Sequence, residues 1–556
     1  MSSDLSQYPE LVQTLLKSRG ISDVNEADHF LNPQFERDVA DPFGILNMER
    51  AVDRILDAID KNERIVVFAD YDCDGIPGGT LFNDFLKKIG YENFEVYIPH
   101  RNNEGYGMSI NAIESLASRR ANLIITIDCG IVDVEPIAYA NELGIDVVVT
   151  DHHLPQEQLP PAYAIVNSKQ VGDTYHDSML CGAAVAWKLV CALLAKRGES
   201  WGVPNGWEKW LLDMAGLSTI ADLVPLQKEN RALAFYGLTV LRKSKRPGLV
   251  ALLAAMGTEQ KNLTEDDIGF MIGPRINAAG RMGDPVDAFK LLSADTKKEA
   301  EEYAEKLMHL NDARKGLVAS MVKEARKHVD ARGVSDVIVV GNPLWRPGLV
   351  GLVAGNLAEA YKRTVFVWGR GENGEIKGSC RSDGTVNVVE LMTTVPENIF
   401  VDVGGHELAG GFSVSSDGIH TLEDELVVAY QKVKCEKGEE PIFVDATLSL
   451  NDVNWTNWKY IEKFAPFGVG NPKPVFRFEK LKILNARYFG KEGTHLELSF
   501  ENSALKAITF FAKEKDAEHG KHGALHAGDI VDLIATIELN TFRNKRELRL
   551  RIVSVE

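Results

Sequence analysis

The amino-acid sequence predicts an α/β protein whose first half is built on a parallel sheet. Short apolar or β-branched runs, typical of strands, stand at 65–68, 94–98, 123–127 and 147–150. Helical stretches separate these runs, at 80–88, 110–119 and 134–143. Strands and helices that alternate at this spacing form a parallel sheet covered on both faces, and ligands bind beyond the carboxyl ends of its strands.

Composition and charge indicate a folded protein of several domains. The 556 residues include 62 Lys and Arg against 80 Asp and Glu, a net charge of −18, and 45% of them are hydrophobic. At about 150 residues per domain, the length predicts three or four domains. The acidic balance argues against indiscriminate coating of nucleic acid but leaves room for a local basic groove.

Cysteine usage and the N-terminus predict a cytoplasmic protein. The six cysteines lack the paired spacing of a disulfide scaffold or a zinc ribbon, which favours a reducing compartment. Residues 1–11 lack the apolar stretch of a signal peptide. The most apolar helical stretch, 183–195, is interrupted by Lys188 and is too short to span a membrane, so we expect no membrane association.

The order of predicted elements divides the chain into five segments. A charged stretch rich in Lys, Glu and Ala predicts a long helix between two lobes, and short strands dominate after a polar linker at 435–441. The expected segments are a helical N-terminal extension (1–45), a first α/β domain (46–294), the connecting helix (295–335), a second α/β lobe (336–436) and a small β-barrel (441–556).

Three carboxylates follow the first predicted strand. Asp70, Asp72 and Asp74 precede Gly75 at the point where the chain turns, and acids this close repel one another unless a cation lies among them. A solvated acidic turn is the plain alternative. A calcium loop is a second alternative, but its twelfth position would hold Leu81 instead of Glu.

Further acidic and histidine residues follow later strands. Asp128 ends the strand at 123–127, His152 and His153 follow Asp151 after the strand at 147–150, and Asp222 comes later. A single Asp after a strand is often only a helix cap. Together, however, these residues would meet at one edge of the sheet, where carboxylates mixed with imidazole favour Mn²⁺, with Mg²⁺ a poorer fit. The set is large enough for two ions about 3.5–4 Å apart, which predicts metal-assisted phosphoester hydrolysis.

The ordered motifs resemble those of the DHH phosphoesterases. They are Asp70-Tyr-Asp72-Cys-Asp74-Gly75, Asp128-Cys-Gly130, Asp151-His152-His153 and Ala221-Asp222. Flanking strings resemble the RecJ family of single-strand-specific 5′→3′ exonucleases, notably around Arg101, at 274–281, at 378–382, at 404–406 and at 465–472. The resemblance implies a two-lobed α/β core with a parallel sheet, a connecting helix, a second α/β lobe and a C-terminal OB-type β-barrel.

The resemblance also implies roles for individual residues. The implied metal ligands are Asp72, Asp74, Asp128, His152 and Asp222, with Asp128 as the bridge and Asp70 as a ligand or its neighbour. His153, beside the scissile phosphate, and Asp128 are the implied catalytic residues. Arg101, Ser379 and Arg381 match positions that hold the 5′ phosphate, and the other implied nucleic-acid contacts are Tyr106, Arg275, Asn277, Arg281 and a glycine-rich turn with Gly404, Gly405 and His406. Cys73, Pro77 and Arg346 depart from the family pattern.

The C-terminal segment carries aromatic residues and a basic cluster. The cluster comprises Arg543, Lys545, Arg546, Arg549 and Arg551. We expect most of the aromatics to form the barrel core, among them Phe467, Phe476, Phe478, Tyr488, Phe489 and Phe542. Any that face outward beside the arginines could stack bases at about 1–3 kcal/mol each.

The motifs predict metal-assisted phosphoester hydrolysis, and the resemblance implies a two-metal 5′→3′ exonuclease that degrades single-stranded DNA in repair and recombination. The expected partners are a single strand with a 5′ end and, among proteins, a single-strand-binding protein or a helicase; the expected state is a monomer. One alternative is a small-nucleotide or oligoribonucleotide phosphatase, which needs neither the barrel nor the long helix. The other is a catalytically silent single-strand-binding replication factor, which needs no full set of metal ligands.

Overall fold

The protein forms two compact units. The computed structural model describes residues 4–101, 103–371, 374–435, 442–490, 494–510, 525–540 and 546–556. The larger unit contains residues 40–224 and 236–439, and the smaller unit contains residues 1–39, 225–235 and 440–556.

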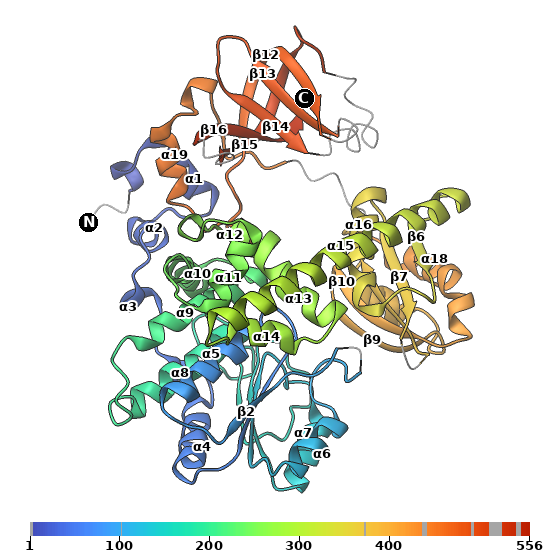
Figure 1. The fold of residues 1–556 in the computed structure, drawn as a ribbon. Coiled ribbons are helices and arrows are strands. Elements are labelled where there is room, and N and C mark those ends of the chain that lie inside the picture. The colour runs from blue at the N-terminus through green and yellow to red at the C-terminus, as the bar shows by residue number, and fades with distance from the viewer. Residues whose placement is uncertain are drawn as a thin grey trace. The chain divides into compact units, whose positions relative to one another are not determined.

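A parallel sheet forms the centre of the first lobe of the larger unit (Figure 1, blue to teal). Its strands, in the spatial order β2-β1-β3-β4-β5, are Phe94–Tyr97, Ile65–Ala69, Leu123–Ile127, Asp146–Thr150 and Ala164–Val166. All pairings are parallel, as the sequence predicts. The short strand β5 is an addition that the sequence did not reveal.

Helices cover both faces of this sheet. On one face, α6 (Ile110–Ser118) and α7 (Val134–Glu142) share a buried core with β1, β3 and β4. On the other lie α4 (Met48–Asp60), α5 (Gly75–Lys88) and α8 (Gly182–Arg197). The carboxyl ends of the strands are therefore left to loops.

A helical layer follows and ends in one long helix. Its helices are α9 (Leu212–Ala221), α10 (Lys228–Leu241), α11 (Pro247–Met256), α12 (Glu265–Asp267), a π-turn (Ile268–Ile272), α13 (Gly273–Met282) and α14 (Val286–Leu292). The long helix α15 (Lys297–Arg332) packs against α11, α13 and α14 and then against α16 (Pro347–Tyr361), so it connects the two lobes of the larger unit (Figure 1).

The second lobe contains a mixed sheet. Its strands, in the order β6-β7-β8-β10-β9, are Val337–Gly341, Thr364–Arg370, Ile376–Arg381, Ala409–Val414 and Phe400–His406, and its further helices are α17 (Val388–Thr394) and α18 (Leu422–Val433). Gly404 and Gly405 pair with Gly411 and Gly410 inside the β9–β10 hairpin. The expected glycine-rich turn is therefore wrong: these residues are in a strand, and the turn that follows lies at 407–408.

The smaller unit combines N-terminal helices with C-terminal strands. The helices are α1 (Glu10–Ser18), α2 (Val24–Leu31), α3 (Phe35–Asp38) and α19 (Trp455–Glu462). The strands are β11 (Ala446–Thr447), β12 (Phe476–Phe489), β13 (His495–Phe500), β14 (Lys506–Phe510), β15 (Ile530–Asn540) and β16 (Glu547–Val555). The strands pair in the order β12-β13-β14-β16-β15. Because β15 also pairs with β12, this series of paired strands closes on itself.

Part of the expected aromatic and basic surface of this unit can be located. Phe476 and Phe478 are fully buried in its core. Arg549 pairs with Glu538, and the Arg551 guanidinium lies 4.1 Å from the centre of the Phe510 ring. Phe542, Arg543 and Lys545, like the linker residues 436–441, lie outside the described residues.

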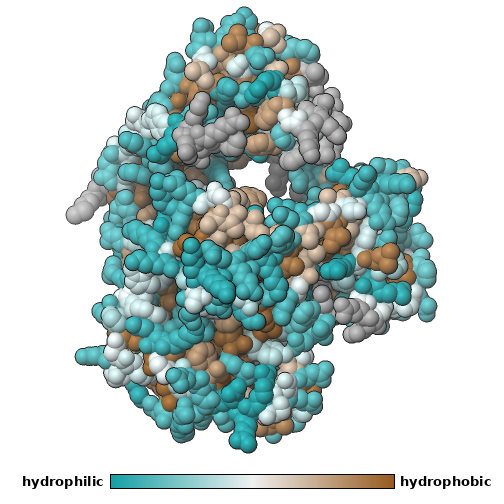
Figure 2. All heavy atoms as spheres, in the orientation of Figure 1, coloured by the Kyte–Doolittle hydropathy of each residue, from teal (hydrophilic) through white to brown (hydrophobic). Residues whose placement is uncertain are grey.

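The surface is largely hydrophilic on the face drawn in Figure 2, with hydrophobic residues in small groups. Among the described residues, no helix is long and apolar enough to cross a membrane.

Candidate metal centre

Three acidic residues continue the strands of the parallel sheet by one position. The backbone N–H groups of Asp70, Asp128 and Asp151 donate to the carbonyls of Ile127, Thr150 and Val166 at 3.1, 3.0 and 3.2 Å. The ladder thus extends past β1, β3 and β4. The sheet itself fixes the three carboxylates in a row at its carboxyl edge.

Asp72 and Asp74 are held at helix N-termini. Asp72 Oδ1 accepts the backbone N–H groups of Asp74 (2.8 Å) and Gly75 (3.2 Å) at the start of α5. The Asp74 carboxylate accepts those of Gly182 (2.6 Å) and Ala183 (2.8 Å) at the start of α8. Orphan N–H groups at a helix start favour a charged carboxylate, so the start of α8 opposes the rise that burial causes in the pKa of Asp74.

Asp128 has an unusual backbone conformation and a crowded position. Its φ of 63° lies in the left-handed region, which Asp tolerates better than most residues. A Cβ at Gly182 would lie 2.5 Å from the Asp128 Cβ. Only glycine therefore lets the start of α8 come this close to Asp128.

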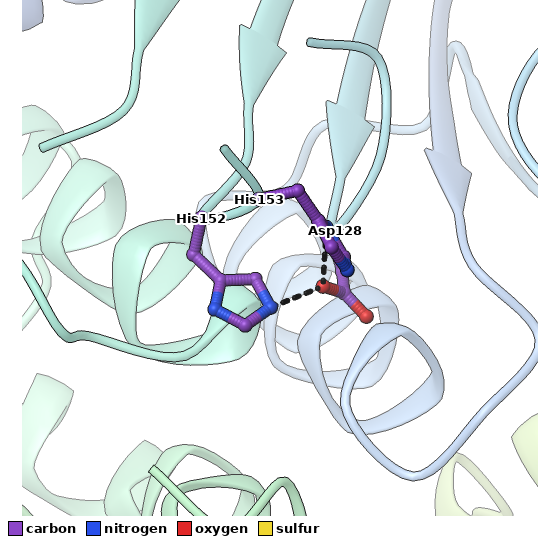
Figure 3. A group of neighbouring side chains, drawn as sticks. All are labelled: Asp128, His152 and His153. Carbon is purple, nitrogen blue, oxygen red and sulfur yellow. Dashed lines mark ion pairs between the residues drawn. The ribbon is translucent and has the colours of Figure 1, made fainter. Parts of the chain in front are cut away.

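His152 lies among the carboxylates. Its Nε2 atom is 3.1 Å from Asp128 Oδ1 and 3.6 Å from both Asp74 Oδ2 and Asp222 Oδ2. Figure 3 shows the His152 ring directed at Asp128. The side chains from four separate motifs, predicted to meet at this edge, do lie within ligand distance of one another.

His153 is oriented by two neighbours. Its Nδ1 atom lies 2.8 Å from Asp151 Oδ1 and 3.1 Å from the Tyr106 hydroxyl, and 3.9 Å from Asp128 Oδ1 (Figure 3). The Tyr106 hydroxyl also donates to the Asp128 carbonyl at 3.2 Å. With Nδ1 bonded to Asp151, the His153 Nε2 atom is the one left for chemistry.

Burial and mutual repulsion raise the pKa of most of these acids. The pKa of Asp70 and of Asp128 lies well above the usual range, and those of Asp222 and Asp74 rise to about 9 and about 6. Burial lowers the pKa of His152 to about 3, so its imidazole is neutral and able to bind a metal. Acids with raised pKa values lose their protons readily only when a cation replaces those protons.

The donor set fits divalent cations. Two groups of three, Asp70–Asp72–Asp128 and Asp74–His152–Asp222, each offer ligand atoms within 4.8 Å of one another, and Asp128 also groups with both histidines. Asp70 Oδ1 and Asp128 Oδ1 are buried and accept no hydrogen bond from the described residues. Buried carboxylate oxygens without a donor are what a bound cation would satisfy.

Of the residues expected to contact nucleic acid, Arg101, Arg281 and Asn277 lie beside this centre. Arg101 stacks over the Tyr71 ring at 5.0 Å, and burial together with Arg101 lowers the pKa of Arg281 to about 10. Arg281 donates to the Gly348 carbonyl of the second lobe at 3.0 Å. Asn277 accepts the Cys73 N–H, and Arg275 donates to the Met271 carbonyl, so both also brace the protein itself.

The residues expected in the second lobe form a separate group. Arg381 donates to Ser379 Oγ at 2.9 Å, and Ser379 donates to the Gly410 carbonyl at 3.0 Å. A Cβ at Gly351 of α16 would lie 3.1 Å from Ser379 Oγ and 3.4 Å from Arg381 Nη2. His406 is exposed at the end of β9.

The sequence motifs include one further contributor to this site and miss two others. Asp151 orients His153, Gly182 makes room for Asp128, and the electrostatic field of the half-buried Lys169 reaches Asp222 and Asp151. The position of Asp151 directly before two histidines was a usable signal. Gly182 and Lys169 carry no local motif, because their roles depend on packing between distant segments.

Three segments match known domain families. Residues 64–217 match the DHH family N-terminal domain, residues 334–433 the DHHA1 domain, and residues 444–554 the RecJ OB domain.

Relatives that match over nearly the whole of this chain carry the name single-stranded-DNA-specific exonuclease RecJ. The protein from Bacillus subtilis (strain 168) is 34% identical over 545 residues, covering 98% of this chain and 67% of the relative. The protein from Haemophilus influenzae is 31% identical, covering 100% and 97%, and that from Escherichia coli (strain K12) is 30% identical, covering 99% and 96%.

Solved structures have the same fold. RecJ in complex with Mn²⁺ from Thermus thermophilus superposes with a TM-score of 0.82 at 25% identity, covering 98% of this chain and 76% of that one. A structure of exonuclease RecJ bound to manganese has a TM-score of 0.60 at 31% identity, covering 70% and 95%. On the domain matches, the identity over whole chains and this fold, the chain belongs to the RecJ family of the DHH phosphoesterases.

Proposed function

We infer that the protein is a metal-dependent exonuclease specific for single-stranded DNA, which acts in repair and recombination. The observation that carries this inference is the convergence of five carboxylates and one imidazole at the carboxyl edge of a parallel sheet, in a chain of the RecJ family. The RecJ OB domain match adds a module suited to binding the single strand.

We propose that two divalent cations bind, one to Asp70, Asp72 and Asp128 and one to Asp74, His152 and Asp222, with Asp128 between them. A neutral imidazole among carboxylates favours Mn²⁺ over Mg²⁺. When bound, such a pair supplies an activated water and neutralises charge on the phosphoryl group.

The residues of the chain position the substrate. In this proposal Arg101, Ser379 and Arg381 hold the 5′ phosphate, because guanidinium forks and a hydroxyl suit phosphate oxygens, and cleavage therefore proceeds 5′→3′. His153, held by Asp151 and Tyr106, presents Nε2 to the scissile phosphate and exchanges a proton there. The remaining predicted contacts line the path of the strand in this proposal. They are Tyr106, Arg275, Asn277, Arg281, Gly404, Gly405 and His406.

The wider setting is also part of the proposal. The catalytic lobe comprises residues 46–294, the connecting helix 295–335 and the second lobe 336–436. The C-terminal segment, 441–556, binds the strand. We propose a cytoplasmic monomer that receives its strand from a helicase or a single-strand-binding protein.

A panel of substrates tests the function. A long 5′-labelled single strand, the same sequence as a duplex and a dinucleotide are each incubated with Mn²⁺ and with EDTA. The proposal predicts release from the long single strand and from neither of the other two substrates. This release should occur with Mn²⁺ and not with EDTA. Release from the dinucleotide only would instead support the phosphatase, and binding of the strand without release would support the silent factor.

Asp128→Asn is the matched variant, since it keeps the size of the side chain and removes its charge. We expect hydrolysis to fall by more than the roughly 10–100-fold seen for residues that only orient a ligand, with strand binding largely kept. Digestion at the parent rate would show that the metal assignment is wrong.

A further inference from the structure

Three exposed apolar residues lie in segments at or next to the carboxylate centre. Leu154, Leu223 and Phe270, here called the apolar rim, are 60%, 65% and 79% exposed. Scattered surface leucines need no explanation. These three differ because Leu154 and Leu223 directly follow His153 and Asp222, and Phe270 lies in a turn that packs against α9.

Leu223 occupies a conformation that its side chain disfavours. It follows Asp222 directly and has a φ of 59°, in the left-handed region that branched residues rarely adopt. Its exposed side chain gains little from packing in return. Backbone strain that packing does not offset is characteristic of functional positions.

Phe270 is presented by an irregular helical turn. It lies in the π-turn Ile268–Ile272, which packs against α9, the helix that ends at Ala221. A Cβ at Gly273, directly after the turn, would lie 3.7 Å from both Ala221 Cβ and Cys73 Sγ. The π-turn is therefore beside the segments that carry Asp72, Asp74 and Asp222, and such turns are frequent at functional sites.

Leu154 reaches the same centre from a third segment. It follows His153, and His152 Nε2 lies 3.6 Å from Asp222 Oδ2. The segments that carry Leu154 and Leu223 therefore meet at the metal centre. Cation binding by carboxylates does not require exposed apolar side chains. The rim therefore fits a ligand that has an apolar part.

We propose that the apolar rim takes up bases of the single strand, which unstack beside the metal centre as the backbone enters. The inference rests on the proposed function and explains part of its strand specificity. Leucine and phenylalanine act as wedges between base steps, and an aromatic ring stacks on any base face, so the contact is independent of sequence. In a duplex the bases are paired and stacked, and their faces cannot reach the rim.

Two substitutions test the rim while sparing the fold. Leu223→Asn removes the apolar surface and suits the left-handed backbone, and Phe270→Ala removes an exposed ring. For each we expect kcat/KM on a long single strand to fall about tenfold. Phe270→Trp should retain the parent rate, because it keeps the stacking surface.

A strand that lacks bases near its 5′ end supplies the decisive comparison. The parent protein should degrade it more slowly, and neither variant should lower that rate further, because no base is present to contact. Leu143→Ala is the control, since Leu143 is 43% exposed at the opposite edge of the sheet, before β4 begins.

Equal losses on intact and base-free strands would overturn the rim and assign these residues a structural role. Parent rates for both variants would overturn it as well. If the parent protein leaves the long strand intact, both the proposed function and the rim are wrong.

Discussion

The pKa values of two neighbouring buried carboxylates, Asp151 and Asp128, shift in opposite directions because their partners differ. Burial alone would raise the pKa of Asp151, but the hydrogen bond and charge of His153 and the backbone N–H groups of His153 and Ile131 lower it. Asp128 Oδ1 accepts no hydrogen bond from the described residues, and burial together with the neighbouring acids raises the pKa of Asp128. Asp151 is thus a fixed anion that orients a histidine, whereas Asp128 needs a cation.

The first prediction concerns Asp151→Asn. The amide keeps the size of the side chain but removes the charge that raises the pKa of His153, so that pKa should fall, as measured by NMR titration. We expect the rate of strand hydrolysis to fall about 10–100-fold, as for other residues that orient a functional histidine. An unchanged rate together with an unchanged pKa would contradict the role assigned to Asp151.

The second prediction is a pH-dependent stability of the metal-free protein. The pKa of Asp222 is raised to about 9 in the folded state, against about 3.9 in the unfolded chain. Between these values the folded state holds a proton that the unfolded chain has lost, so stability falls as pH rises, by at most about 1.4 kcal/mol per pH unit for this group.

Thermal unfolding in EDTA and in Mn²⁺ checks this prediction. We expect Tm to decrease from about pH 5 to about pH 9 in EDTA and to lose that trend in Mn²⁺, because bound ligands are already deprotonated. Asp222→Asn should flatten the curve in EDTA. A Tm in EDTA that rises over this range would contradict the account.

At the scale of elements, the carboxylates depend on how closely helix α8 approaches the sheet. The first N–H groups of α8 hold Asp74, and Gly182 leaves room for Asp128. The helix start is therefore part of the metal centre, although it contributes no ligand.

The third prediction is that Gly182→Ala inactivates the protein. The new Cβ would lie 2.5 Å from the Asp128 Cβ, so either α8 or Asp128 must move. Displacement of a catalytic group by about 1 Å costs about a hundredfold in rate, which strand hydrolysis would show. Gly355→Ala in α16 is the control: its Cβ meets nothing within 4 Å, so it should add about 0.5–1 kcal/mol of stability and keep the parent rate.

Sequence patterns predicted the strands better than the boundaries next to the site. The apolar run 123–127 coincides with β3, because a strand buried on both faces has a continuous hydrophobic signal. Helix α5 begins at Gly75 and not at 80, because Pro77 and the glycines around it signal a break although they fall in the first turn, where proline is tolerated. Strand β5 is only three residues long, too short for a pattern.

At the scale of the whole molecule, the N-terminal helices belong to the same compact unit as the C-terminal strands. Arg19 donates to Asn471 Oδ1 at 2.9 Å and pairs with Asp445 at 3.4 Å, with both side chains of the ion pair mostly buried. Sequence could not predict this association, because the partners are more than 400 residues apart and no local pattern joins them.

The fourth prediction is that Arg19→Ala destabilises the smaller unit. Removal of one partner from a buried ion pair lowers the free energy of unfolding by about 3 kcal/mol or more. Calorimetry should therefore show that this unit unfolds at a lower temperature. Arg37→Ala is the control, because its more exposed ion pairs should contribute no more than about 1 kcal/mol. Equal effects of the two variants would contradict the assignment.

The central claim is that side chains from four motifs jointly bind two divalent cations, and anomalous diffraction from crystals soaked in Mn²⁺ tests it most directly. We predict two peaks about 3.5–4 Å apart at the carboxyl edge of the parallel sheet. One should contact Asp70, Asp72 and Asp128, and the other Asp74, His152 and Asp222. An edge without anomalous density, or peaks bound by other residues, would contradict the account.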